Sequence, residues 1–138
     1  MSELVRFGVS IEGPLLADFD RLIEQKGYAS RSEAFRDLIR NALVESEWRE
    51  LKGEQVATLT LVYNHEYREI TDRLTDMQHE YHHLVVCATH VHLTHHTCLE
   101  AIVLRGKAGQ LRAMADRLIA TRGVQHGKLT MTTLGRER

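Results

Sequence analysis

Apolar and polar residues alternate near the N-terminus in the pattern of a short β-strand. A strand is predicted over residues 4–11, because its odd positions are all apolar whereas Arg6, Gly8 and Ser10 occupy the even positions between them. Strand side chains alternate between two faces, so this segment has one apolar and one polar face. The apolar face needs a partner to cover it.

Two amphipathic helices are predicted after this strand. Pro14 suits a first helical turn, where its missing N–H is not needed, and an apolar stripe follows over residues 15–23. Ser30 and Glu33 have the spacing of a capping box, which opens a second helix with apolar positions between residues 34 and 43. The N-terminal part therefore reads strand, helix, helix.

A lone strand with two short helices cannot satisfy its own backbone hydrogen bonds or bury both stripes, so we expect an intertwined dimer. Paired strands from two chains form a ribbon that fits the DNA major groove, where Arg6 can bind guanine and Ser10 can contact bases. The element order, the strand around residues 6–10 and the turn at residues 27–34 resemble the ribbon-helix-helix repressors. The alternative is a dimerisation arm without a DNA role.

The remaining chain alternates strand and helix periods. The polar residues 50–55 are predicted as a linker between a DNA-binding domain at 1–49 and a second domain at 56–138. In the second domain we expect strands at 56–63, 84–93, 98–104 and 124–134, with helices at 66–81 and 111–119. This βαββαβ order is the ferredoxin-like plan, so the fold class is α+β.

Three candidate metal ligands cluster in the predicted hairpin of the second domain. His90 and His92 share a strand face, and a reversal through residues 95–97 would pair residue 94 with Cys98 and bring the thiolate to that face. Imidazole and thiolate donors suit Zn(II), Cu(II) or Ni(II), and a third nitrogen in plane would favour Ni(II). The alternative is a hairpin with surface histidines and a buried cysteine.

The predicted helices should cover one face of the sheet. Strand parity assigns Val85, Cys87, Val91 and Leu93 to the covered face, with Cys87 as core packing, and leaves the ligand cluster on the bare face. A bare, partly apolar sheet face usually packs against another subunit. We therefore expect the metal site at a subunit interface.

Composition narrows the class of protein. The 138 residues include 18 basic and 19 acidic groups, so DNA contacts must come from a few placed residues and from helix N-termini. No stretch of 18 apolar residues and no signal segment is apparent, which predicts a cytoplasmic protein without a membrane anchor. Two cysteines are too few for a disulfide framework.

Several motifs together resemble the NikR family of nickel-responsive transcriptional regulators. The strongest lie at residues 31–34, 78–79, 90–100 and 122–127, and the resemblance covers nearly the entire chain. It implies an ACT-type sensory domain, a homotetramer built as a dimer of dimers, and nickel in a square plane of three imidazoles and one thiolate at the tetramer interface. By matching motif, His90, His92 and Cys98 come from one chain and His79 from another.

Further roles are implied only by this resemblance. His95 and Glu100 would orient the metal ligands, and Arg36 would contact a DNA phosphate. Glu33 and Asp37 would hold a second, harder cation, although an ordinary acidic helix face is the alternative. Family members often have threonines where this chain has Gly8 and Ser10.

The function expected from these observations is nickel-dependent repression. Nickel would select a tetramer whose two DNA-binding dimers engage a palindromic operator in double-stranded DNA. Two alternatives are a metal-dependent hydrolase with Glu100 as general base, and a metal buffer or chaperone. A closed four-donor site leaves no position for an activated water, so we expect no enzymatic activity.

Overall fold

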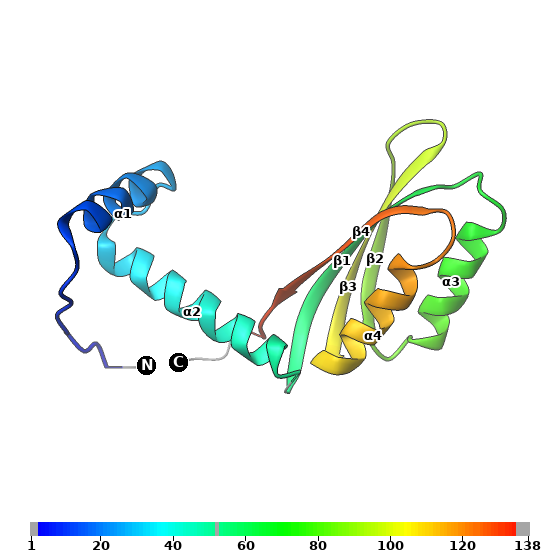
Figure 1. Ribbon diagram of the computed structural model, residues 1–138. Coiled ribbons are helices and arrows are strands. Elements are labelled where there is room, and N and C mark those ends of the chain that lie inside the picture. The colour runs from blue at the N-terminus through cyan, green and yellow to red at the C-terminus, as the bar shows by residue number, and fades with distance from the viewer. Residues whose placement is uncertain (1–2, 52, 135–138) are drawn as a thin grey trace. The chain divides into compact units, whose positions relative to one another are not determined.

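The computed structural model describes residues 3–51 and 53–134 (Figure 1). They form two compact units that divide between Leu43 and Val44. Of the described residues, none belongs to a helix that is both long enough and apolar enough to cross a membrane. The proposed limits of the DNA-binding domain, linker and sensory domain stay predictions.

The first unit contains the first predicted helix and most of the second. Helix α1 spans Gly13–Gln25 with Pro14 in its first turn, and helix α2 spans Arg31–Arg49. At the start of α2 the Glu33 backbone N–H donates to the Ser30 hydroxyl at 3.3 Å, as the capping box predicts. The Phe19 and Phe35 rings lie 5.1 Å apart between their centroids and join the two helices.

The strand predicted at residues 4–11 is not formed, since the described segment 3–12 has no regular secondary structure. A ribbon strand bonds to its copy in a second chain, and a single chain offers it no such partner. Its apolar side chains are accordingly exposed, with Leu4 at 83%, Val5 at 80% and Phe7 at 70%. Apolar exposure of this extent on one short segment is typical of an interaction surface.

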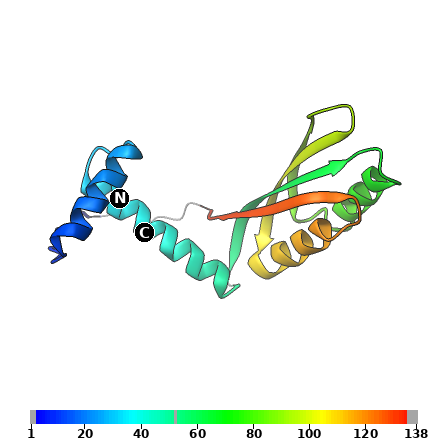
Figure 2. The ribbon, with the colours of Figure 1, turned by 45° about the horizontal axis from the view of Figure 1, so that its top comes forward.

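The second unit has the predicted βαββαβ order. A four-stranded antiparallel sheet has the order β2-β3-β1-β4, and both helices lie on the same face of it (Figures 1 and 2). The elements are β1 (Glu54–Asn64), α3 (Ile70–Glu80), β2 (Val85–His92), β3 (Thr97–Lys107), α4 (Ala108–Ile119) and β4 (Val124–Thr132). The helix expected from residue 66 begins later, because Glu69 has a left-handed φ of 54° that interrupts a helix.

The predicted covered face of β2 holds at Val85, which packs against the core, and is wrong for Cys87, Val91 and Leu93, which are exposed. Cys98, Glu100, Ile102 and Leu104 of β3 are buried towards the helices, and β2 places His92 opposite Cys98 and His90 opposite Glu100. Cross-strand partners share a face, so the histidines lie on the helix-covered side and Cys87 is exposed. The pairing register shifts between Val85 and Cys87, and one extra residue there moves every later side chain to the other face.

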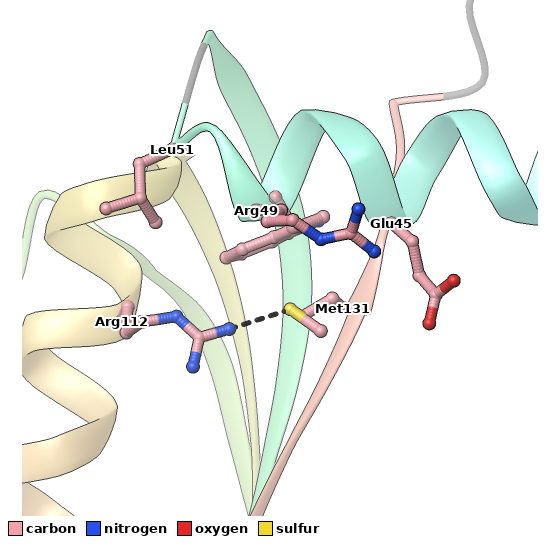
Figure 3. Close-up of a pocket in the computed structure, with 6 residues that line it drawn as sticks. Glu45, Arg49, Leu51, Arg112 and Met131 are labelled. Atoms are coloured by element: carbon pink, nitrogen blue, oxygen red, sulfur yellow. Dashed lines mark hydrogen bonds between the residues drawn. The ribbon is translucent and has the colours of Figure 1, made fainter.

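The last turns of α2 belong to the second unit and are fixed there by Trp48. Its indole is 1% exposed and its Nε1–H donates to the Thr132 carbonyl of β4 at 2.9 Å. A hollow of about 380 Å³ beside it is lined by residues of α2, α4 and β4, and Arg112 reaches across it to the Met131 sulfur at 3.0 Å (Figure 3). The end of α2 is therefore anchored to the four-stranded sheet.

Candidate metal centre

The hairpin between β2 and β3 brings the first two metal donors together. The Leu93 N–H donates to the Thr97 carbonyl at 2.9 Å, and the Cys98 Sγ lies 3.4 Å from the His92 Nδ1. The predicted pairing of residue 94 with Cys98 is wrong, because His92 is the observed partner. Residues 92 and 94 have the same parity, so the thiolate and imidazole still share a face.

A third donor comes from His65, which the sequence reasoning missed. Its ligand nitrogen and those of His92 and Cys98 all lie within 4.8 Å of one another, the only such group of three among residues 3–51 and 53–134. His65 follows β1, where Tyr63 is paired with Cys98, and its backbone N–H donates to the His96 carbonyl at 2.9 Å. Antiparallel pairing of β1 with β3 and the shared parity of residues 63 and 65 would have identified it.

His90 has other partners in this structure. Its Nε2 lies 2.7 Å from the Glu100 Oε2, and its Nδ1 lies 3.3 Å from the Tyr63 hydroxyl. The Gln78 side-chain amide of α3 donates to both Glu100 oxygens, at 3.1 and 3.2 Å. Glu100 is fully buried, so these contacts supply the hydrogen bonds that a buried carboxylate requires.

The phenol of Tyr63 keeps its proton in this network. Burial, followed by the nearby Glu100 and Cys98 charges, raises the pKa of Tyr63 to about 12. A protonated phenol can donate to the His90 Nδ1, and the tautomer of His90 with Nε2–H then donates to Glu100. The chain Tyr63–His90–Glu100–Gln78 is thus consistent in its donors and acceptors.

The structure does not bring His79 or the His95 ring into this group. His79 is exposed in the last turn of α3, directly after Gln78. His95 is exposed in the hairpin turn, and its carbonyl accepts a hydrogen bond from the His65 Nε2. The assignment of His79 as a ligand from another chain stays a prediction.

The other predicted site residues lie in the first unit. Arg6, Gly8, Ser10 and Arg36 are all exposed. Glu33 is exposed, and the half-buried Asp37 accepts a hydrogen bond from the Tyr28 hydroxyl at 2.7 Å. Within the described chain, Glu33 and Asp37 have no third donor close enough to complete a cation site. Their DNA and cation roles stay predictions.

In a comparison with known proteins, both parts of the chain match a protein family. Residues 56–132 match the family "NikR C terminal nickel binding domain", and residues 5–46 match "Ribbon-helix-helix protein, copG family". A "Putative nickel-responsive regulator" of Geobacter metallireducens is 58% identical, covering 99% of each chain. One of the same name from Thermococcus onnurineus is 50% identical, covering 98% of each.

A solved structure resembles the fold. The uncharacterized protein TM1266 from Thermotoga maritima matches with a TM-score of 0.53 and 13% identity, covering 59% of this chain and 100% of its own. At this identity the likeness concerns the fold alone. Full-length identity above one half, with a ribbon-helix-helix match followed by a nickel-binding match, is decisive: the chain belongs to the NikR family of nickel-responsive transcriptional regulators.

Proposed function

We propose that this regulator is a repressor that binds a palindromic operator when nickel occupies a site shared between chains. The observation that carries the proposal is the approach of the Cys98 Sγ to the His92 Nδ1, at 3.4 Å, in a chain whose N-terminal part matches a DNA-binding family. A thiolate with imidazoles is a donor set for a borderline transition metal, whereas Mg(II) and Ca(II) require oxygen.

The proposed nickel ligands are His90, His92 and Cys98 of one chain with His79 of a second chain, in a square plane. Two features of the structure support this division. His79 is exposed on α3 and does not approach the donors of its own chain, so a second chain can receive it. His90 lies on the same strand face as His92, so its side chain would be able to join the site on release from Glu100. These ligands would hold the ion between two chains and so link them.

The proposed assembly is a homotetramer, a dimer of dimers. The exposed apolar residues of segment 3–12 support pairing of two chains as a ribbon, whose polar face would present Arg6, Gly8 and Ser10 to the major groove. Arg36 would contact a phosphate and set the register. Linking two such dimers makes the second binding event intramolecular, which raises affinity about 10² to 10⁴-fold without a new contact.

Three further assignments belong to this proposal. The DNA-binding domain spans 1–49 and the sensory domain 56–138, joined by 50–55. Glu33 and Asp37 hold a second, harder cation on the DNA-binding domain. The regulator acts in the cytoplasm, where operator DNA lies, and does not catalyse a reaction, because four protein donors in a plane leave no site for an activated water.

Operator binding by the full-length protein tests this function. DNA fragments are selected from a random pool by nickel-loaded protein, and the affinity for the enriched palindrome is then measured with Ni(II) and with a chelator. We expect binding about 10² to 10⁴-fold tighter with nickel. The same affinity in both conditions would contradict a nickel-dependent repressor. A matched Zn(II) titration distinguishes a specific response from a general effect of divalent ions.

A further inference from the structure

We propose that Arg117 is a positioning residue: it holds the last turn of α3 in the arrangement that presents His79 to a second chain. This inference rests on the proposed nickel ligands, and it adds a residue of α4 that does not itself bind metal. The observation that carries it is the contact of one guanidinium group with both residues that directly follow His79, namely Glu80 and Tyr81.

The end of α3 that carries His79 has no fully buried side chain. Ile70 and Leu74 anchor the first half of the helix, and the next fully buried side chain is Leu84. Residues 75–83 between them are half-buried or exposed. A segment with few buried apolar contacts opens locally at a lower free energy than the core does. A helix as short as α3 also needs contacts with its neighbours to persist, so its last turn depends on such contacts.

Arg117 supplies contacts of this kind from the last turn of α4. Its Nη1 donates to the Tyr81 hydroxyl at 2.8 Å and to the Glu80 Oε1 at 3.3 Å, and its Cζ lies 5.4 Å from the centre of the Tyr81 ring. A guanidinium group is planar and carries five N–H donors, so one side chain can bind a hydroxyl, a carboxylate and a ring face together. Arg117 therefore links the end of α3 to the end of α4.

Long side chains, rather than close packing, connect the two helices at this point. The helices α3 and α4 lie side by side on one face of the sheet (Figures 1 and 2), and a hollow of about 360 Å³ is lined by Met77 of α3, Arg117 of α4 and neighbouring residues. The Thr121 hydroxyl donates to the Met77 sulfur at 3.5 Å, and a thioether is a weak acceptor. The charge-assisted contact of Arg117 with Glu80 is of a stronger kind.

These contacts leave the imidazole of His79 free. Successive helix residues lie about 100° apart, so Tyr81 is about 200° around the turn from His79 and almost opposite to it. Tyr81 accordingly packs against the core, whereas His79 is exposed. Gln78 holds the same turn to the sheet through its bond to Glu100. The backbone of the turn is thus fixed from its inner side, and the side chain of His79 points away from those contacts.

The expected consequence is an effect on nickel affinity that exceeds the effect on stability. The Arg117 and Glu80 side chains are 49% and 59% exposed, and exposed ion pairs contribute little to the stability of a domain. A ligand, however, binds only the fraction of molecules that have the competent arrangement, and its apparent affinity falls with that fraction. Local disorder of the α3 end would therefore weaken nickel binding while the domain stays folded.

Nickel titration and amide exchange of the full-length protein test the role of Arg117. The variants are Arg117→Ala and, as a control, Arg112→Ala, an exposed arginine of the same helix that contacts Met131 instead of α3. We expect Arg117→Ala to lower Ni(II) affinity about 5- to 30-fold, as for the loss of one hydrogen bond and one cation–π contact, and Arg112→Ala to leave it unchanged. In metal-free protein, the backbone amides of residues 79–84 should exchange faster in Arg117→Ala alone. Unchanged affinity or unchanged exchange in Arg117→Ala would overturn the proposal.

His79→Ala distinguishes positioning from a general structural role. In this background Arg117→Ala should lower Ni(II) affinity no further, because the ligand that it positions is gone. A further loss of the same size would mean that Arg117 supports the whole domain, and it would overturn the positioning role. Wild-type Ni(II) affinity in His79→Ala would contradict the proposed nickel ligands instead, and exchange at residues 79–84 would still decide whether Arg117 orders the turn.

Discussion

Cys98→Ala is expected to lower the Ni(II) affinity of the full-length protein by more than about 100-fold and to abolish the sulfur-to-nickel charge-transfer band. The reason is that the thiolate is the only anionic donor in the proposed set, and even changes to the partners of ligands lower affinity 10- to 100-fold. Cys98 is buried beside His92, so no other sulfur replaces it at that position. Ni(II) titration followed by absorption measures both effects.

Cys87→Ala is the matched control for this prediction. The two cysteines are the only ones in the chain, and they lie on opposite faces because the register of β2 shifts before Cys87. Cys87 is exposed, and its replacement should leave both the affinity and the absorption band unchanged. Far-UV circular dichroism of each variant verifies the fold. A charge-transfer band that persists in Cys98→Ala would contradict the assignment of the thiolate.

Phe7→Asp is expected to abolish dimerisation and, with it, operator binding. Phe7 is 70% exposed in the single chain and belongs to the apolar face that would be covered by the ribbon of a second chain. A carboxylate there must be buried twice in the dimer, once for each chain, without a partner. Sedimentation should show a smaller assembly, and fluorescence anisotropy should show no binding to the operator at concentrations that saturate the wild type.

Arg6→Ala distinguishes the pairing of two chains from the recognition of DNA. Arg6 is on the polar face of the same segment, so this variant should keep the assembly of the wild type. A bidentate contact to guanine contributes about 1–3 kcal/mol, and two copies in a dimer contribute roughly 2–6 kcal/mol, which corresponds to an affinity loss of about 30-fold or more. Unchanged operator affinity would mean that the strand pairs two chains without reading DNA. Wild-type assembly of Phe7→Asp would contradict the ribbon itself.

The order of the elements could be predicted from sequence because periodicity and capping are local signals. The apolar alternation at 56–63 and the apolar stripe at 111–119 each mark the face of one element that packs against the core. The capping pair Ser30 and Glu33 marks the start of α2. The onset of α3 was missed because the left-handed Glu69 has no distinctive sequence signal. A non-glycine residue in that conformation is uncommon.

The candidate site could be predicted only in part, because it depends on pairing between distant segments. His92 and Cys98 were identified by alternation within one hairpin. The covered face was assigned wrongly because the extra residue at the start of β2 reverses the parity, and such an irregularity has no signal in an apolar run such as residues 84–87. His65 requires knowledge that β1 lies beside β3, which is a tertiary fact.

Residues 3–12 differ from the strand that the sequence predicts for them. Their alternation predicts a strand, but the described segment has no regular secondary structure. In the proposed ribbon the hydrogen bonds of this strand would come from a second chain, and a single chain shows only its exposed apolar residues. Val9 and Ile11, at 56% and 37% exposure, extend the same uncovered face.

The central claim is that nickel and operator are coupled through one assembly, and reciprocity tests it most directly. The Ni(II) dissociation constant of the wild-type protein is measured with and without saturating operator duplex, against a scrambled duplex of equal length. Coupling between two ligands is mutual, so operator must tighten nickel binding by the same factor by which nickel tightens operator binding. We predict that these two factors are equal and that each is about 10² to 10⁴. Identical nickel dissociation constants with operator and with scrambled DNA would contradict the account.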